Sequence, residues 1–401
     1  MTDAPSPSSI HSEVASPRPI AEHPASEEFA RARLRRFRKL IFFVQFILLA
    51  AHGVLYATWV AFHPALDVQA RLLIGLATVV AAVSFVAASL LTWSHFNWAV
   101  RAFYTVCAVW IGVMDFGVFA SCACWIFLGI TRLAGLRVDP ALIADGFFSA
   151  GLLVALYGVI NGAWVRVNHV TVKLPNLPEE WRGREAALVS DLHLGHVRNL
   201  GFMRRVVGQL NQLRPDVVFI CGDMYDGTLV DVEALAQPWS ALAAPWGALF
   251  ICGNHEEFTH RARYLRAVAE AGVRVLNNEK VDLQGMQIIG VHFRETTDPV
   301  RYRTALQNAA ISRERASILL VHAPHRMGIA EDAGVSLQLS GHTHGGQFPP
   351  GSWVASRIYG PFVHGLNRLG KMQVFTSWGV GTWGPPLRVG TKPEIVLIRF
   401  E

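Results

Sequence analysis

The distribution of charged residues along the chain is the feature that most constrains its fold. Residues 41–165 carry eight charged side chains in 125 positions, whereas the other 276 positions carry the remaining 58 of the 66 (36 basic and 30 acidic). This interval holds four apolar runs, at about 40–62, 72–94, 102–130 and 140–165. Each reaches or exceeds the roughly 20 residues that a helix needs to cross a bilayer. Because a core helix of a soluble protein would have a polar face, the runs predict four transmembrane spans.

The same asymmetry excludes a single soluble globule, a disordered chain and a small disulfide-built domain. The net charge is +6, and one run at residues 31–39 holds six cations. The rest of the chain is therefore near neutral and has no broad basic face, so we expect no nucleic-acid partner. A basic run directly before an apolar run indicates a cytoplasmic N-terminus that contacts anionic membrane lipids. Four spans then return the rest of the chain to the cytoplasm. We therefore expect a multi-pass protein of the inner (cytoplasmic) membrane, with its C-terminal domain in the cytoplasm.

Three parts follow from these patterns. Residues 1–39 form the first part. Residues 1–28 are a tail rich in Pro, Ser and Ala, which we expect to be disordered, and the basic juxtamembrane segment follows them. Residues 40–165 form the four-span part. Asp115 lies near the middle of the third run, where a carboxyl group is either hydrogen-bonded between helices or functional. Residues 166–401 form the third part.

Short apolar runs typical of strands recur after residue 166 and alternate with helical patterns such as that of 202–213. Examples of the strand-like runs are 186–190, 216–220, 248–252, 273–277, 286–291, 316–321 and 394–400. Strands that alternate with helices predict a layered α/β domain. The 236 residues of 166–401 are enough to bury a full core.

Polar side chains follow five strand-like runs at the point where each run ends. They are Asp191 and His193, then Asp223, then Asn254 and His255, then His322, and last His342 and His344. Ligand sites of open α/β sheets lie outside the carboxyl ends of the strands, so these side chains are expected to converge. Asp oxygens and His nitrogens suit Zn, Mn or Fe. The set is too large for one cation and predicts two, which together can bind a phosphate and activate a water molecule.

The motifs also carry a family resemblance. In order, they are D-x-H (Asp191–His193), G-D (Gly222–Asp223), G-N-H-E (Gly253–Glu256), His322 after a strand, and G-H-x-H (Gly341–His344). This series resembles the calcineurin-like metallophosphoesterases over about residues 180–400. The run SGHTHGGQ and the late GVGTWGPPLRVGTKPEI look like the bacterial subgroup that often carries N-terminal membrane helices. The resemblance implies a layered α/β/β/α sandwich after the four spans.

The resemblance also implies residue roles, with two divalent transition-metal ions (Mn, Fe or Zn) as cofactors. The implied ligands are Asp191, His193 and His344 for one ion, Asn254, His322 and His342 for the other, and Asp223 as the bridge between them. His255 would not bind metal, but would contact the phosphate oxygens or protonate the leaving group. His196 and Arg198 are candidate substrate contacts. A plain surface role is the alternative for His196, and Arg198 could hold a phosphate or a carboxylate.

These roles imply hydrolysis of a phosphodiester or pyrophosphate by a hydroxide that two metals activate. Relatives of similar build include hydrolases of UDP-2,3-diacylglucosamine, so a lipid-linked phosphoester is one expected substrate. A soluble phosphodiester such as a cyclic nucleotide is the alternative substrate. A second alternative is that the protein is a non-catalytic membrane binding module. No obligatory protein partner is inferred. The aromatic-rich segment 348–383, which includes Trp353 and Trp383, either packs a C-terminal subdomain or forms a lip for acyl chains.

Overall fold

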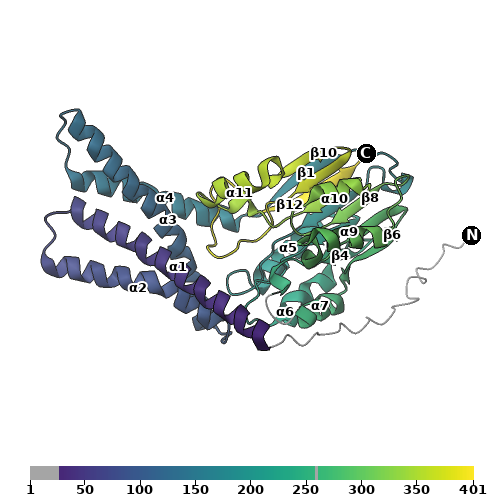
Figure 1. The fold of residues 1–401 in the computed structure, drawn as a ribbon, viewed down its shortest axis with the longest axis horizontal. Helices are drawn as coiled ribbons and strands as arrows, with labels where there is room; N and C mark the ends of the chain where they lie inside the picture. The colour runs from purple at the N-terminus through teal and green to yellow at the C-terminus, as the bar shows by residue number, and fades with distance from the viewer. Residues whose placement is uncertain (1–26, 258–260) are drawn as a thin grey trace, which may run out of the picture. The chain divides into compact units, whose positions relative to one another are not determined.

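A computed structural model describes residues 27–257 and 261–401 (Figure 1). Contacts divide the chain into two compact units, residues 1–42 and residues 43–401. The expected disordered tail of residues 1–28 lies outside the described residues except for its last two, which begin a helix.

The α-helices are α1 (Glu27–Phe62), α2 (Val68–Thr92), α3 (Trp98–Leu133), α4 (Pro140–Ala163), α5 (Leu200–Leu213), α6 (Val232–Ala236), α7 (Arg261–Glu270), α8 (Phe293–Thr296), α9 (Pro299–Asn308), α10 (Met327–Asp332) and α11 (Gly351–Tyr359). The strands are β1 (Arg166–Val172), β2 (Glu185–Val189), β3 (Val217–Cys221), β4 (Ala248–Ile251), β5 (Arg274–Val275), β6 (Glu279–Leu283), β7 (Met286–Gly290), β8 (Ser317–Leu320), β9 (Leu337–Ser340), β10 (Gly365–Leu369), β11 (Met372–Thr376) and β12 (Glu394–Phe400).

Among the described residues, four helices are long and apolar enough to cross a membrane, as predicted. They are Lys39–Phe62, within α1, and the whole of α2, α3 and α4. Helices α2 and α3 each begin four residues before the predicted apolar run, because a polar side chain ahead of the run caps the helix. Asp67 accepts a hydrogen bond from the N–H of Ala70, and Asn97 accepts one from the N–H of Val100.

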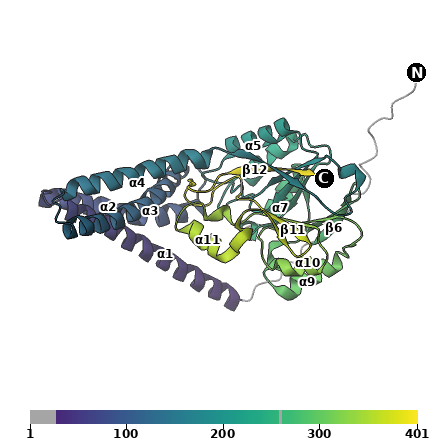
Figure 2. The ribbon, with the colours of Figure 1, turned by 90° about the horizontal axis from the view of Figure 1, so that it is seen from above.

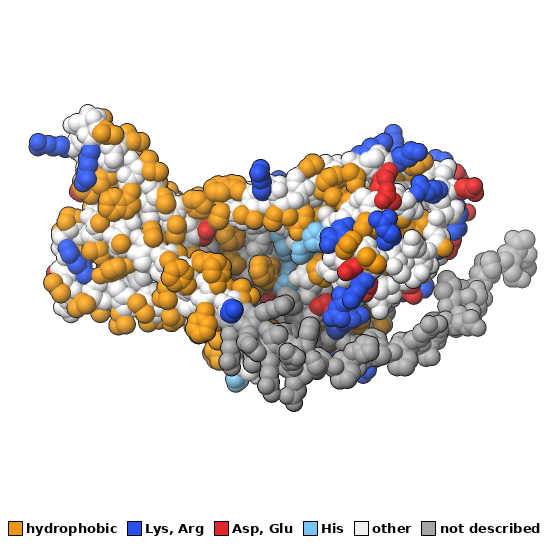
Figure 3. All heavy atoms as spheres, viewed as in Figure 1, with side chains coloured by type: hydrophobic (Ala, Val, Ile, Leu, Met, Phe, Trp, Pro, Cys, Tyr) orange, Lys and Arg blue, Asp and Glu red, His pale blue; other side chains and the backbone are white. Residues whose placement is uncertain are grey.

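The surface of these spans is apolar, as a lipid environment requires. Exposed large side chains on α2 and α4 include Leu72, Leu76, Val80, Leu153 and Ile160. Hydrophobic side chains are spread over the helical part of the molecule, whereas charged side chains gather over the α/β part (Figure 3). Asp115 on α3 is half-buried, and its Oδ2 atom accepts no hydrogen bond from the described residues.

The remaining residues form two six-stranded sheets that pack face to face. The strand order is β1-β12-β2-β3-β4-β5 in the first sheet and β10-β11-β9-β8-β7-β6 in the second. Helix α5 lies on one side of the strands, and α9 and α10 lie on the other (Figure 2). The predicted α/β/β/α architecture is therefore confirmed.

Alternation along the strands builds the three apolar layers of this sandwich. In β3, Val218 and Ile220 face the layer under α5–α7, whereas Val217 and Phe219 face the layer between the sheets. The middle layer continues through side chains of the second sheet such as Ile318. A third apolar layer lies between the second sheet and helices α9 and α10. The inner strands β3, β4, β8 and β9 are thus buried on both faces, which fits their largely apolar sequences.

The topology determines where a site can form. Strands β2, β3 and β4 are parallel neighbours in the first sheet, and β8 and β9 are parallel neighbours in the second. Their carboxyl ends carry the polar motifs, so the ligands come from two facing sheets and not from one open sheet. Only Trp164 and Val165 separate α4 from β1, which places the α/β domain directly after the last span.

Candidate metal centre

The seven predicted ligands all lie at or just beyond the carboxyl ends of five strands. β2 leads to Asp191 and His193, β3 to Asp223, β4 to Asn254, β8 to His322, and β9 to His342 and His344. Five of them have left-handed backbone conformations, with φ of 54° at Asp191, 47° at His193, 52° at Asp223, 71° at His342 and 48° at His344. Such conformations cost on the order of 1–3 kcal/mol each and persist only where the surroundings hold them. The left-handed conformations at these strand ends therefore indicate a functional site, because chain reversal alone does not require them.

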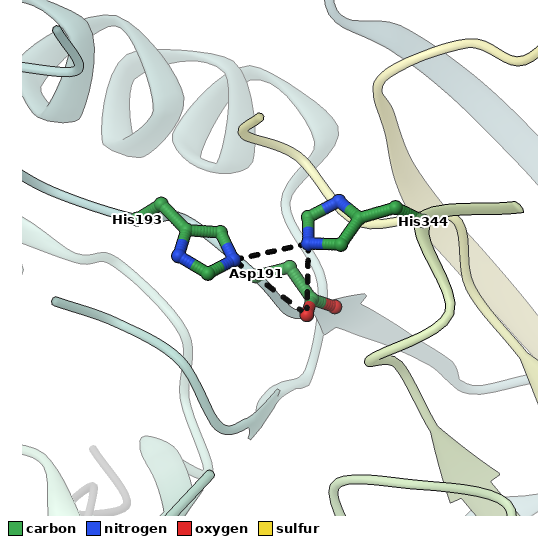
Figure 4. A group of neighbouring side chains, drawn as sticks. All are labelled: Asp191, His193 and His344. Atoms are coloured by element: carbon green, nitrogen blue, oxygen red, sulfur yellow. Dashed lines mark hydrogen bonds and ion pairs between the residues drawn. The ribbon is translucent and has the colours of Figure 1, made fainter. Parts of the chain in front are cut away.

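Asp191, His193 and His344 form what we call the first ligand triad (Figure 4). The Nε2 atoms of His193 and His344 lie 3.0 Å apart. Asp191 Oδ1 lies 4.0 Å from Nε2 of His193 and 3.5 Å from Nε2 of His344. Two imidazole nitrogens and one carboxylate oxygen thus face a common point, which is the donor set that Zn, Mn or Fe accepts.

Asn254, His322 and His342 form the second ligand triad, centred on Nε2 of His322. This nitrogen lies 3.1 Å from Asn254 Oδ1 and 3.0 Å from His342 Nδ1. Asp223 Oδ2 lies 3.1 Å from the same nitrogen and 3.8 Å from Nε2 of His193 in the first triad. One carboxylate oxygen therefore faces both triads, as a bridging ligand must. The structure brings together all seven residues that the sequence predicted.

Hydrogen bonds behind the ligands orient them. Nδ1 of His322 lies 2.8 Å from the carbonyl of Cys221, so a proton on Nδ1 leaves Nε2 free to bind metal. The buried carboxylate of Glu256 accepts hydrogen bonds from the backbone N–H groups of Gly253, Asp223 and Tyr225 at 2.7, 2.9 and 3.2 Å. Glu256 therefore fixes the turn that carries Asp223.

Two glycines allow the strand ends to approach one another. A Cβ atom at Gly222 would lie 2.6 Å from Nδ1 of His322, and φ there is +82°. A Cβ atom at Gly341 would collide with the carboxylate of Asp191 and the side chain of Ser190. Larger residues at either position would therefore separate the ligands.

The directions of the pKa shifts indicate which side chains of the site are charged and which are neutral. Burial would raise the pKa of Asp223, but His322 and His255 hold it well below its usual range. Burial would lower the pKa of His322, but the charge and hydrogen bond of Asp223 raise it to about 10. Burial and the charge of His322 lower the pKa of His342 to about 3, and burial with the charge of His193 lowers that of His344. Metal binding needs neutral imidazoles and an ionised carboxylate, so His342, His344 and Asp223 already have the required charge, whereas His322 would release its proton when a cation binds.

His255 lies beside the centre with its ring against the first triad. Its ring centroid is 4.6 Å from that of His193, and its Nε2 is 4.0 Å from Oδ2 of Asp223. Its Nδ1 lies 3.0 Å from the backbone carbonyl of Asp226, so a proton on Nδ1 is held by that carbonyl. This hydrogen bond directs the other ring nitrogen toward the site.

Asp226 belongs to the site although the sequence analysis did not select it. Its Oδ1 lies 3.4 Å from Nδ1 of His193 and 3.9 Å from Nδ1 of His255. A carboxylate behind a ligating histidine fixes the ring and increases its basicity. The available signal was its position in G-D-M-Y-D, three residues after Asp223, on the loop that already carried a ligand.

We expect Asp226→Asn to weaken metal binding by about 10–100-fold, the usual effect of losing such an outer partner. Manganese titration of the metal-free protein measures this directly. Asp282→Asn, at an exposed turn of the second sheet, is the control and should bind as the wild type does. Wild-type affinity in the Asp226 variant would show that this carboxylate does not support His193.

The two candidate substrate contacts lie next to the spans. His196 is buried, with Nε2 3.3 Å from the carbonyl of His95 in the α2–α3 loop. Its ring contacts those of Phe96 and Tyr104. Arg198 is also buried and donates to the carbonyl of Gly162 on α4 at 2.6 Å. The alternative of a plain surface role is therefore wrong for His196, and a role as substrate contacts stays a prediction for both residues.

Comparison with known proteins places this geometry in a family. The family model described as calcineurin-like phosphoesterase matches residues 186–346. An uncharacterized metallophosphoesterase of Campylobacter jejuni is 31% identical over 270 residues, which cover 65% of this chain and 71% of that protein. A Danio rerio transmembrane protein with a metallophosphoesterase domain is 28% identical over 324 residues, covering 72% of this chain and 73% of that protein. An uncharacterized metallophosphoesterase of Aquifex aeolicus is 30% identical over 263 residues, covering 62% of this chain and 97% of that protein.

These matches confirm the predicted resemblance. The matched region begins in β2 and ends with the G-H-x-H motif, so it contains all seven converging ligands. The family implies two divalent metal ions, and the oxygen and nitrogen donors present here suit them. The chain, in which four apolar helices precede a hydrolase domain for phosphoric esters, belongs to the calcineurin-like metallophosphoesterase family.

Proposed function

We propose that this protein hydrolyses a phosphodiester or pyrophosphate carried on a membrane lipid, with two divalent cations held by the two ligand triads and Asp223. Manganese, iron and zinc all suit these donors. When bound, the cations polarise a water molecule and neutralise charge on the phosphate. The observation that carries the lipid part of the proposal is the apolar, partly exposed border of the metal centre, which continues onto α3.

The chain's own residues have separate tasks in this proposal. The two triads and Asp223 would hold the cations. His255 would contact the phosphate oxygens, because its ring lies beside both Asp223 and His193 and outside the two triads. In its doubly protonated form it would give the Nε2 proton to the departing oxygen, while Nδ1–H stays hydrogen-bonded to the Asp226 carbonyl. Asp226 holds His193 and His255 in place through its carboxylate and its backbone carbonyl.

Aromatic side chains border the centre. The ring of Phe293 lies 5.7 Å from that of His322, and the ring of Trp383 lies 6.1 Å from that of His255. Trp383 is 57% exposed although its backbone is fixed, since its N–H donates to Gln347 Oε1 and its carbonyl accepts from Gln347 Nε2. Histidine side chains are visible in a hollow with a hydrophobic rim (Figure 3). An exposed indole on a rigid loop beside His255 is suited to contact an apolar part of the substrate.

Helix α11 extends this border to the spans. Trp353, Val354 and Ile358 are 61%, 55% and 66% exposed and lie on one short helix. The ring of Trp353 packs edge-on against that of Phe119 on α3 at 5.8 Å. The exposed apolar face of α11 is thus continuous with a helix that crosses the membrane, and it supports the reading of segment 348–383 as a lip for acyl chains.

The proposal also includes the side of the membrane on which the α/β domain lies. The basic run at 31–39 directly precedes the first span, and positive residues favour the cytoplasmic side. We therefore propose that the metal centre faces the cytoplasm at the surface of the inner membrane. Labelling of a single added cysteine at exposed Lys173 by a membrane-impermeant reagent, in intact cells and in inverted vesicles, distinguishes the two orientations.

The test compares two substrates in the full-length protein in detergent micelles with added manganese. UDP-2,3-diacylglucosamine serves as the lipid substrate and an aryl phosphodiester as the soluble one. We expect the double variant Trp353→Ser, Trp383→Ser to lose about tenfold or more in kcat/KM on the lipid substrate, because burial of one large apolar side chain is worth about 1.5–3 kcal/mol. The soluble substrate should be affected far less.

Trp98→Ser is the matched control, since Trp98 is 82% exposed at the start of α3 and away from α11. Equal losses on both substrates would remove the argument for a lipid substrate. Wild-type turnover of the aryl diester without turnover of the lipid would keep the phosphoesterase and favour a soluble phosphodiester as substrate.

A further inference from the structure

Two buried arginines join the metal centre to the end of α4. Arg198 follows the loop that carries His193, and the carbonyl of Arg198 accepts a hydrogen bond from the N–H of Gly195 at 2.7 Å. Its guanidinium donates to the carbonyl of Gly162 at 2.6 Å and to Thr382 Oγ1 at 3.2 Å. Since Gly162 lies in the last turn of α4, the His193 loop is attached to the fourth span.

Arg388 makes the second connection, to His344. Its Nη1 donates to the His344 carbonyl at 3.1 Å, and its Nη2 lies 3.0 Å from Nδ1 of the same imidazole. Nη2 also donates to the carbonyls of Trp378 and Gly381, both at 2.7 Å. The N–H of Gly381 in turn donates to the carbonyl of Asp191 at 2.8 Å. This one guanidinium therefore supports two members of the first ligand triad.

Helix α4 holds the backbone of Arg388. The N–H of Arg388 donates to the carbonyl of Gly158 at 2.9 Å. Nδ2 of Asn161 donates to the carbonyls of Arg388 and Thr391 at 2.8 and 2.9 Å, and Asn161 is only 3% exposed. A buried amide on a membrane helix thus uses both of its N–H groups on the segment that carries Arg388.

The same segment fits into a notch of small residues on α3 and α4. Leu387 is fully buried against Phe116 of α3 and Ala155 of α4. A Cβ atom at Gly112 would collide with the Leu387 side chain, and one at Gly162 would lie 3.0 Å from the carbonyl of Pro386. The spans and the α/β domain therefore pack closely at this point, with no room for a longer side chain.

We propose that the last turns of α4 are part of the metal centre, and that Asn161 is a positioning residue for the first ligand triad. This inference rests on the metal-ligand assignment of the proposed function. Asn161 and the carbonyls of Gly158 and Gly162 hold the two arginines, and the arginines hold the loops of His193 and His344. Ligand orientation of this kind is worth about 10–100-fold in metal affinity. The fourth span is therefore a structural support of the site as well as an anchor.

Asn161→Leu tests the proposal in the full-length protein in detergent micelles. Leucine has a similar size but leaves the carbonyls of Arg388 and Thr391 without their donor. The background carries Asn254→Ala and His342→Ala, so that calorimetric titration of the metal-free protein with manganese reports the first triad alone. We expect the affinity to fall by about 10–100-fold. Thr131→Val is the control, because Thr131 is buried on α3 and its hydroxyl donates to Leu128 of its own helix.

A second pair of variants keeps the test valid if Asn161→Leu does not fold. Gly162→Ala places a methyl group against Pro386 and Leu387, whereas Gly146→Ala, on the same helix, meets nothing within 4 Å. We expect weaker manganese binding in Gly162→Ala and wild-type binding in Gly146→Ala. Wild-type affinity in both Asn161→Leu and Gly162→Ala would overturn the proposal, as would equal weakening by Gly146→Ala.

The binding measurement also separates this inference from the proposed function. If the wild type binds manganese at the first triad but hydrolyses neither test substrate, the proposed function fails and the role of Asn161 is still measured. If hydrolysis of either substrate is seen and both Asn161→Leu and Gly162→Ala bind manganese normally, the phosphoesterase stands and the support by α4 is disproved.

Discussion

Asp223→Asn is expected to abolish measurable hydrolysis while the protein stays folded. Asp223 Oδ2 faces both triads, at 3.1 Å from His322 Nε2 and 3.8 Å from His193 Nε2, so one substitution removes the only carboxylate that the two proposed cations share. Outer partners of a metal are worth about 10–100-fold, so loss of a direct bridging ligand should lower kcat by more than about 100-fold. Kinetics on an aryl phosphodiester and metal analysis of the purified variant measure the two effects.

The metal content should fall below two ions per chain, because the neutral amide of asparagine is a poorer bridging ligand than a carboxylate. Asp231→Asn is the control: Asp231 caps α6, where asparagine caps equally well, so activity and metal content should stay at wild-type values. Turnover by Asp223→Asn within tenfold of wild type would refute the bridging role.

His255→Gln is expected to lower kcat by about 100–10,000-fold, the usual contribution of a positioned general acid. The metal content should stay at two, because His255 lies outside both ligand triads and contacts Asp223 at 4.0 Å through its Nε2 atom. The loss should be large for a diester with an alkoxide leaving group and small for one with a nitrophenolate, since a weakly basic oxygen departs without a proton. Rates for a series of leaving groups measure this dependence.

The control for this variant is His169→Gln, because His169 is exposed on β1 and should be replaceable without effect. A loss in His255→Gln that is equal for all leaving groups would contradict proton donation. If a fall in metal content accompanied that equal loss, His255 would instead be a ligand.

The local sequence was sufficient to find the four spans and the seven candidate ligands that converge in the fold. Long apolar runs without a polar face can be stable as helices only in lipid or in a fully apolar setting, and the described part of the chain holds four of them. The strand ends were recognisable because polar motifs directly followed apolar runs, as at Asp191 and His322. The boundaries of the spanning segments differ from the apolar runs by a few residues, most at the starts of α2 and α3, where Asp67 and Asn97 begin the helix earlier than the apolar pattern does.

Residues that act through contacts distant in the sequence were harder to find. Asp226 is defined by its 3.4 Å approach to His193, and its position three residues after Asp223 was the only local signal for it among the described residues. His196 and Arg198 were selected as polar residues near a motif, but their partners are His95 and Gly162, which belong to the membrane part. A charged side chain near a motif can face either the substrate or a neighbouring element, and only packing decides between them.

The sequence by itself determined the membrane helices, the α/β character of the rest and which side chains are candidate ligands, because these depend on periodicity and on the chemistry of side chains at strand ends. Tertiary structure alone decided that the ligands come from two facing sheets, and that the loop of Arg388 lies in the notch formed by Gly112, Gly158 and Gly162. The physical reason is that Asn161 and Arg388 are 227 residues apart, so their hydrogen bond exists only once both domains have folded against each other.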